Sequence, residues 1–215
     1  MAESMKGLHR THRCTEVSSS NIGQQVTVMG WVQKRRNLGS LIFIDLRDRS
    51  GLLQIVFDEP KVGSEGFAKA ESLRSEYVIA VEGMVEKRAA AVNEHLKTGD
   101  IEVIASSIRI LSESETPPFP IEENSQTKED LRLRYRYLDL RRPDLQRNMM
   151  MKSKVSMLLR NFMEREGFLE IETPMLTKST PEGARDYLVP SRVHPWTFYA
   201  LPQSPQLFKQ LLMCS

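Results

Sequence analysis

The chain has 215 residues, 40% of them hydrophobic and 27% charged, which is typical of a globular protein. Its 30 Lys and Arg residues nearly balance 28 Asp and Glu residues, so a basic surface for nucleic acid can only be local. The chain has two cysteines, which excludes a disulfide framework. It has no apolar run near the ~20 residues of a membrane helix and no secretory signal, which excludes a membrane protein. We therefore expect a cytoplasmic location.

The first half of the chain is expected to consist mainly of strands. Val26, Val28 and Val32 alternate with polar residues, which is the period-two pattern of a half-buried strand. The predicted strands cover residues 26–33, 41–45, 52–57, 77–85 and 101–110, and one helix is predicted over residues 63–74. Five strands with a helix after the third indicate a small closed barrel, in the order of an oligonucleotide-binding (OB) barrel.

The second half is expected to be helical, after a proline-rich linker that begins near Ser112. We place an OB domain at residues 1–111, a linker and hinge at 112–142, and part of a second domain at 143–215. A long amphipathic helix is predicted from Pro143 to just before Gly167. A strand-like run covers residues 168–171, and another amphipathic helix begins at Pro205 and reaches Met213. Because the sequence stops inside that helix, we expect the second domain to be truncated.

Several residues of the predicted barrel fit an RNA-binding surface. Phe43 lies between Ile42 and Ile44, so it faces outward if those two residues face the core. Gln54 has the same parity on the next strand, and the cations at residues 34–36 could follow phosphates. Each feature also has a structural interpretation, since Phe43 could be a core residue and the cationic run a solvated strand end.

Metal binding near the N-terminus is the other chemistry that the residue types suggest. His9, His12 and Cys14 could supply ligands, but no second group of ligands follows to complete four-coordination. We therefore expect no metal site.

Four blocks of the sequence resemble a known family. They cover residues 30–51, 134–148, 167–192 and 198–213. The blocks resemble, in that order, the anticodon-binding OB domain of class IIb synthetases, the hinge and entry helix of aspartyl enzymes, class II motif 1 with the loop after it, and the aspartate-binding strand and helix. The chain as a whole thus resembles the N-terminal part of bacterial-type aspartyl-tRNA synthetases. The resemblance implies an α+β chain, in which a five-stranded OB barrel and a linker precede the beginning of an antiparallel class II catalytic domain.

The resemblance also implies roles for individual residues. Phe43 would stack on an anticodon base, Gln54 and Glu102 would read base edges, and Arg36 would lie at the anticodon stem. Pro174 would lie at the dimer interface. Glu182 would contact the α-ammonium of the substrate, Gln206 and Lys209 would recognise aspartate, and Ser204 would lie close by.

These residue types suit the chemistry of aspartate. Gln206 and Lys209 are three positions apart, so on a helix they share a face. Lys209 can supply the fixed cation that the side-chain carboxylate needs, and Glu182 can pair with the ammonium group. An unmatched buried charge is unfavourable, and this penalty would reject asparagine.

The implied reaction is the activation of L-aspartate by ATP with Mg²⁺, followed by its transfer to tRNA-Asp, in a homodimeric full-length enzyme. Motifs 2 and 3, which hold ATP in this family, would lie beyond residue 215. We therefore expect this chain to be inactive alone and to bind no cofactor tightly. The sequence departs from the family at Trp196, where a small residue is usual.

Three alternatives remain open at this stage. The chain could be a stand-alone OB module that binds RNA and carries a degenerate tail. The asparaginyl and lysyl enzymes share the OB domain, although the blocks around residues 136–142 and 200–206 favour the aspartyl enzyme. Leu38 in the first barrel turn is typical of relatives specific for tRNA-Asp, whereas relatives that also charge tRNA-Asn often carry histidine there.

Overall fold

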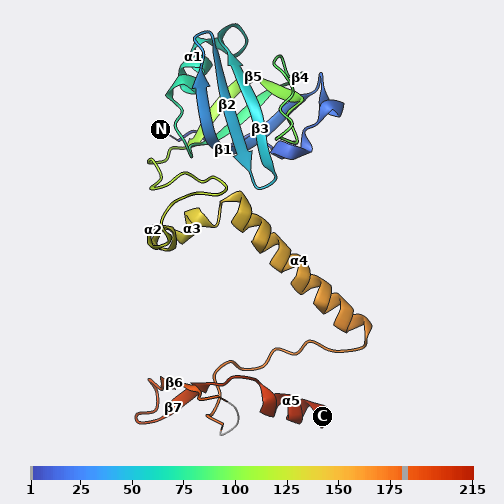
Figure 1. Cartoon of the computed structure of the whole chain (residues 1–215), viewed down its shortest axis with the longest axis vertical. Coiled ribbons are helices and arrows are strands. Elements are labelled where there is room, and N and C mark those ends of the chain that lie inside the picture. The colour runs from blue at the N-terminus through green and yellow to red at the C-terminus, as the bar shows by residue number, and fades with distance from the viewer. Residues whose placement is uncertain (1, 181–183) are drawn as a thin grey trace. The chain divides into compact units, whose positions relative to one another are not determined.

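The computed structural model describes residues 2–180 and 184–215. These residues form two compact units, one ending at Gln146 and the other running from Arg147 to Ser215. Figure 1 labels the elements of both units, which are described separately below.

The first unit contains a closed five-stranded barrel. Its strands are β1 (Gln25–Asn37), β2 (Leu41–Asp48), β3 (Gly51–Asp58), β4 (Val78–Lys87) and β5 (Ile101–Ser112). They are hydrogen-bonded in the order β1-β2-β3-β5-β4, and β4 pairs with β1 to close the barrel (Figure 1). The β3–β5 pair is parallel and the others are antiparallel. The predicted OB order of strands is therefore confirmed.

One helix follows the third strand, as predicted, although its bounds differ. Helix α1 spans Glu59–Ser72 and has a kink at Gly63, where φ is +77°. Glycine adopts this left-handed conformation without steric penalty, so the helix extends to the N-terminal side of the predicted start.

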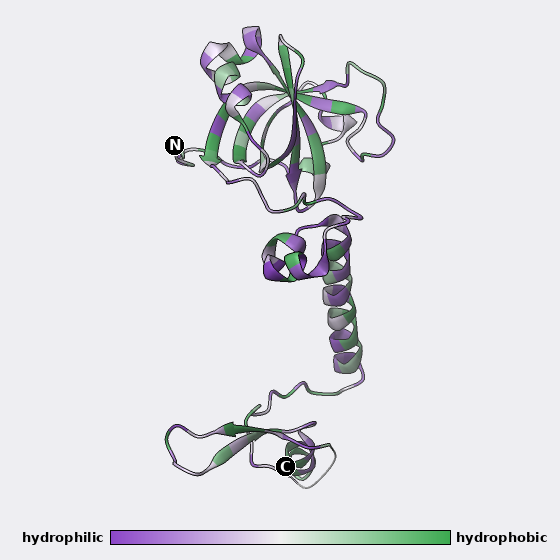
Figure 2. Ribbon diagram, turned by 60° about the vertical axis from the view of Figure 1, so that its left-hand side comes forward, coloured by the Kyte–Doolittle hydropathy of each residue, from purple (hydrophilic) through white to green (hydrophobic). Residues whose placement is uncertain are grey.

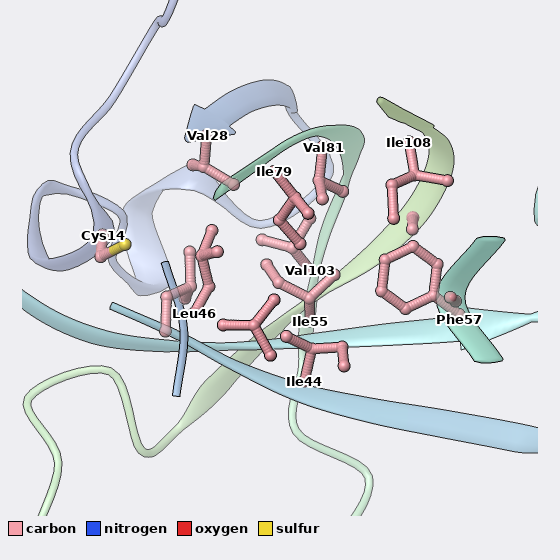
Figure 3. Packing of buried hydrophobic residues seen from close by; sticks show 14 of the residues in the cluster. Cys14, Val28, Ile44, Leu46, Ile55, Phe57, Ile79, Val81, Val103 and Ile108 are labelled. Carbon is pink, nitrogen blue, oxygen red and sulfur yellow. The ribbon is translucent and has the colours of Figure 1, made fainter. Parts of the chain in front are cut away.

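The barrel interior is filled by side chains that alternate along the strands. Ile44 and Leu46 of β2, Ile55 of β3 and Val103 of β5 are fully buried and meet in the centre (Figure 3). Gly30 of β1 allows two strands to approach closely. A Cβ on Gly30 would lie 2.4 Å from the carbonyl oxygen of Arg47, so only glycine fits there without a backbone shift.

Two short 3-10 helices precede the barrel: η1 (Cys14–Glu16) and η2 (Ser19–Asn21). Cys14 is fully buried within the core, and its backbone N–H donates to Asp48 Oδ2 at 2.9 Å. This bond ties the N-terminal segment to the end of β2.

The segment after the barrel is ordered although it has little regular structure. No helix or strand forms between Ser112 and Lys128, in keeping with the predicted linker, but Phe119 and Ile121 are buried. Two short helices follow, α2 (Glu129–Arg134) and α3 (Arg136–Asp139), which the sequence did not predict. They lack an apolar stripe, and we refer to residues 129–142 as the hinge segment.

The hinge segment is organised by charge around Asp139. The carboxylate of Asp139 is fully buried and accepts hydrogen bonds from Arg132 at 2.9 Å, from Arg142 at 3.1 Å and from Arg136. Burial by itself would raise the pKa of Asp139, but the hydrogen bonds from Arg132 and Arg142 outweigh it, so the pKa lies below its usual value.

Helix α4 spans Pro143–Arg165 and ends before Gly167, as the sequence predicted. It carries both apolar and polar side chains along its length (Figure 2). Its apolar residues are exposed; Leu158, for example, has 67% of its surface accessible.

The remainder of the second unit consists of the antiparallel strands β6 (Tyr187–Pro190) and β7 (Phe198–Leu201) and helix α5 (Gln206–Met213). The strand predicted at residues 168–171 is wrong, since this stretch is irregular. A strand needs a partner for its backbone hydrogen bonds, and in the described ranges no strand pairs with these residues. Among the helices of the described residues, none is long and apolar enough to cross a membrane.

Candidate nucleic-acid interface

Phe43 lies on the outer face of the barrel. Its neighbours Ile42 and Ile44 are fully buried in the core, whereas the ring of Phe43 is partly exposed. In the strand register Phe43 lies opposite Arg36 of β1 and Val56 of β3. The sequence allowed Phe43 to face either the core or the outside, and in the structure it faces outward.

Gln54 is the centre of a polar cluster on the same face. It lies opposite Asp45 and is only 4% exposed, although it does not point into the apolar core. Its Oε1 accepts hydrogen bonds from Arg36 Nη2 at 3.1 Å and Arg88 Nη2 at 3.0 Å. Its Nε2 donates to Glu102 Oε2 at 2.8 Å.

These partners fix the orientation of the Gln54 amide. A guanidinium group can only donate and a carboxylate can only accept, so the oxygen must face the arginines and the nitrogen must face Glu102. Both lone pairs of Oε1 are thereby used. The one hydrogen-bonding group of Gln54 that remains is the second N–H of its amide, which is a donor.

Arg36 connects this cluster to Phe43. Its Nη2 lies 3.0 Å from Asp45 Oδ1, and its guanidinium carbon lies 5.7 Å from the centroid of the Phe43 ring, within cation–π range. The positive charge of Arg36 is therefore held beside the aromatic ring rather than free in solvent.

The three cations at residues 34–36 do not act as one cluster. A bulge between Val32 and Lys34 sets the register, and Lys34 and Arg36 then lie opposite the outward-facing Asp45 and Phe43. Arg35 lies opposite the buried Ile44 and donates to the backbone carbonyl of Glu71 in α1. The expectation that all three follow phosphates is therefore corrected for Arg35.

Glu102 and Arg88 complete the cluster. Glu102 is buried, and its Oε1 accepts from the backbone N–H of Ala89 at 3.3 Å. Arg88 was missed from the sequence, because it follows the end of β4 and no periodic pattern marks it. Its Nε and Nη1 are buried and have no hydrogen-bond partner within residues 2–180 and 184–215. Such unsatisfied donors are rare in proteins and favour an acceptor from a ligand or water.

The N-terminal residues that the sequence raised as metal ligands are not gathered into a site. Cys14 lies in the core, where burial raises the pKa of its thiol, and His9 is exposed. Within the described part of the chain, no three His, Cys, Asp or Glu residues are grouped so that they could hold an ion.

The second unit contains an open pocket of about 500 Å³ at the start of α5. The side chains around it come from the segment before β6, from the β7–α5 connection and from α5 itself: Thr177, Lys178, Thr180, Pro202, Gln203, Ser204, Pro205, Gln206, Leu207, Phe208 and Leu211. Ser204 and Gln206, which the sequence analysis placed together, thus both line this pocket.

The other residues predicted for aspartate are placed differently. Lys209 shares α5 with Gln206 but is exposed and not part of the pocket wall, whereas Lys178 is a wall residue that the sequence analysis missed. Nothing in the sequence signals Lys178, because its segment is irregular. Glu182 lies outside the described residues.

Hydrogen bonds shape the segments around the pocket. Asp186 Oδ2 accepts from Ser179 Oγ at 3.0 Å and from the backbone N–H of Thr180 at 3.1 Å.

Pro174 is exposed in an irregular stretch. Trp196, in the β6–β7 connection as expected for a loop residue, is 97% exposed with φ of +65°.

Family models match both units. Residues 26–111 match the model described as OB-fold nucleic acid binding domain, and residues 128–215 match the model described as tRNA synthetases class II (D, K and N).

Curated relatives match over the whole chain. An aspartate–tRNA ligase of Agathobacter rectalis is 78% identical over 215 residues, which is 100% of this chain and 36% of that protein. An aspartate–tRNA(Asp/Asn) ligase of Lachnoclostridium phytofermentans is 75% identical with the same coverage. The chain belongs to the bacterial aspartyl-tRNA synthetase family. It spans about a third of the length of these relatives.

Solved structures of other synthetases are similar to this chain in fold. The asparaginyl-tRNA synthetase of Pyrococcus horikoshii, complexed with asparaginyl-adenylate, matches 97% of this chain and 46% of its own, with 28% identity and a TM-score of 0.83. A putative aspartyl-tRNA synthetase of Leishmania major matches 99% of this chain and 42% of its own, with 26% identity and a TM-score of 0.83. The OB barrel followed by the beginning of a class II synthetase domain is therefore the fold of the chain.

Proposed function

We propose that the barrel of this chain reads the anticodon of tRNA-Asp and that the second unit contributes part of the aspartate pocket of an aspartate–tRNA ligase. The observation that carries the proposal is the cluster on the outer face of the barrel. It combines an aromatic ring, an oriented amide and two arginines within one hydrogen-bonded group. Single-stranded RNA is recognised by this combination of stacking, base-edge contact and positive charge.

The geometry of the cluster supports a separate role for each residue. Phe43 offers a partly exposed ring on which an anticodon base stacks. Gln54, whose oxygen is already occupied, donates its free N–H, so the facing base edge presents an acceptor. Glu102 holds that amide in place, and Arg36 supplies positive charge for the phosphate of the anticodon stem.

In the second unit, the pocket at α5 is proposed to take L-aspartate. Ser204 and Gln206 line it, and Lys209 and Glu182 are proposed to pair with the side-chain carboxylate and the ammonium group. Lys178 adds a further cation to the wall. A site with matched charges discriminates against asparagine, because the amide would leave Lys209 without its anion.

The whole ligase is proposed to be a cytoplasmic homodimer, with Pro174 at its interface, that uses ATP and Mg²⁺. ATP would supply the adenylyl group that activates the unreactive carboxylate of aspartate, and pyrophosphate would be released. The residues of this chain bind and orient aspartate and the anticodon. The arginines expected to hold ATP belong to motifs 2 and 3, which residues 1–215 do not contain. This chain alone is therefore expected to show no aspartate-dependent exchange of pyrophosphate into ATP, and measurable exchange would contradict the division of roles.

The anticodon proposal is tested by binding of this chain to tRNA-Asp. We expect substitution of the anticodon or the Phe43→Ala change to weaken binding by about 1–3 kcal/mol, the contribution of one stacked base. Phe198→Ala is the matched control, because that exposed ring lies on β7 and should leave the affinity unchanged. Binding that is indifferent to both the anticodon and Phe43 would refute the proposal.

The same assay tests discrimination between tRNAs. Leu38 is exposed in the turn between β1 and β2, and it predicts a preference for tRNA-Asp over tRNA-Asn. The prediction would be contradicted if the chain bound both tRNAs with equal affinity and if no substitution of Leu38 lowered the affinity for one of them selectively.

A further inference from the structure

Glu76 is an unusual residue in the connection between α1 and β4. It is 6% exposed and adopts a left-handed backbone conformation with φ of +68°. Its backbone N–H donates to the carbonyl oxygen of Val32 at 2.7 Å. A charged residue without glycine's conformational freedom is held there only if its surroundings compensate for the strain and the desolvation.

Two arginines from distant parts of the chain supply that compensation. Arg47 of β2 donates through Nη2 to both carboxylate oxygens of Glu76, at 2.7 and 2.9 Å. Arg141 of the hinge segment, 65 residues after Glu76, donates through Nη2 to Oε2 at 2.6 Å. The Arg47–Glu76 pair is 7% and 5% exposed, so water does little to replace a lost partner.

Arg141 is also packed against the barrel wall. Its guanidinium carbon lies 4.4 Å from the centroid of the Trp31 ring on β1, a close cation–π contact. Burial lowers the pKa of Arg141, and the Glu76 carboxylate counteracts that effect. One side chain of the hinge segment therefore contacts both an anion and an aromatic ring of the barrel.

The hinge segment is also tied to the linker before it, since Arg142 Nε donates to the carbonyl oxygen of Glu122 at 3.1 Å. Its helices α2 and α3 are six and four residues long and are too short to be stable in isolation. Asp139 organises the segment internally by accepting from its own arginines. What fixes the segment to the barrel by charge is Arg141.

We propose that Arg47, Glu76 and Arg141 form a latch that fixes the hinge segment to the anticodon-binding barrel, so that the two move as one body. The chain then leaves the barrel from a fixed point after residue 142 rather than from a free tether. The latch is argued from the geometry of the first unit alone and does not depend on the proposed RNA binding.

The latch is tested with two variants of this chain. Glu76→Gln removes the anion and keeps the shape of the side chain, and Arg141→Met removes the cation and keeps apolar contact with Trp31. The control is Glu86→Gln, which removes the anion from an exposed pair with Lys61. Hydrogen exchange is followed at the amides of Leu140 and Arg142, which are hydrogen-bonded within the hinge. Tryptic cleavage is followed after Arg134, which is exposed and which all the chains retain.

In both latch variants we expect the hinge amides to exchange, and the hinge to be cleaved, at least about tenfold faster than in the unaltered chain. In the control variant both rates should stay within about twofold of the unaltered chain. The amides of Ile55 and Val103 in the barrel report whether it stays folded. If Glu76→Gln unfolds the barrel, Arg141→Met decides the question, since it leaves the Arg47–Glu76 pair intact. Hinge amides as protected in Arg141→Met as in the unaltered chain would overturn the proposal.

Discussion

The two units of the chain bury their apolar residues to very different extents. The barrel encloses a continuous core, with residues such as Ile55 and Val103 fully buried. Among the described residues from Arg147 onward, Ala200 is the one hydrophobic residue that is buried. The barrel thus encloses its own apolar core, whereas α4 and α5 present apolar side chains to solvent.

The candidate sites reflect this difference. On the barrel, Gln54 and Glu102 are held by neighbours on three strands and a loop, so the amide that would read a base is already oriented. In the second unit, Gln206 is exposed in the wall of an open pocket, and Lys209 is exposed on the same helix outside that wall. A rigid scaffold preorganises a site, and the barrel supplies that scaffold while the second unit does not.

The largest expected effect is on folding. Ile55→Ala should lower the free energy of unfolding of the barrel by about 2–5 kcal/mol, because it leaves a cavity in a closed core. Leu158→Ala, which truncates an exposed side chain of α4, should change stability by no more than about 0.5 kcal/mol. Urea titration of both variants measures the contrast, and equal losses would mean that the two units are not packed as differently as described.

A smaller effect is expected from acid. The pKa of Asp139 is lower in the folded hinge segment than the roughly 3.9 of an unfolded chain, so its contribution to stability is complete above pH ~4. That contribution is lost as the pH falls through the lower, folded value. Fluorescence of Trp31 in a Trp196→Phe background should therefore change below pH ~4 as the hinge segment loosens. In an Asp139→Asn chain the hinge should already be loose at neutral pH. If the Trp31 fluorescence of that chain still changed below pH ~4 as in the unaltered chain, the acid transition would belong to another titrating group.

The smallest effect is expected from exposed ion pairs, in either unit. Glu86 pairs with Lys61 at 3.3 Å on the barrel, and Glu170 pairs with Arg160 at 2.9 Å beside α4. Replacing either glutamate by glutamine should change the free energy of unfolding by no more than about 1 kcal/mol, because solvent screens both pairs. A larger loss at Glu170, seen by the same urea titration, would show that this pair organises the second unit more than its exposure suggests.

Alternation along the strands predicted the barrel well. The same parity rule placed Phe43 and Gln54 on the outer face, because buried Ile42, Ile44, Leu53 and Ile55 determine it. The bulge after Val32, which sets the register of residues 34–36, is not revealed by the local sequence. The burial of Gln54 by polar neighbours rather than by the core also depends on contacts between distant strands.

Features made by charge contacts rather than by apolar periodicity could not be predicted. The hinge helices are held by arginines around Asp139 and not by an apolar stripe, so periodicity did not reveal them. Arg88 enters the site only because β4 and β3 lie on the same barrel. The run at residues 168–171 has the composition of a strand, but a strand also needs a partner that local sequence cannot supply.

The latch has a practical consequence for where this barrel can be cut. An RNA-reading module excised after residue 111, the domain boundary predicted from the sequence, would lose Arg141. Glu76 would keep only Arg47, and the face of Trp31 that the guanidinium covers would become accessible to other proteins in solution. Transplanting the barrel into another protein therefore calls for a graft that runs to Gln146, with the hinge included as part of its wall.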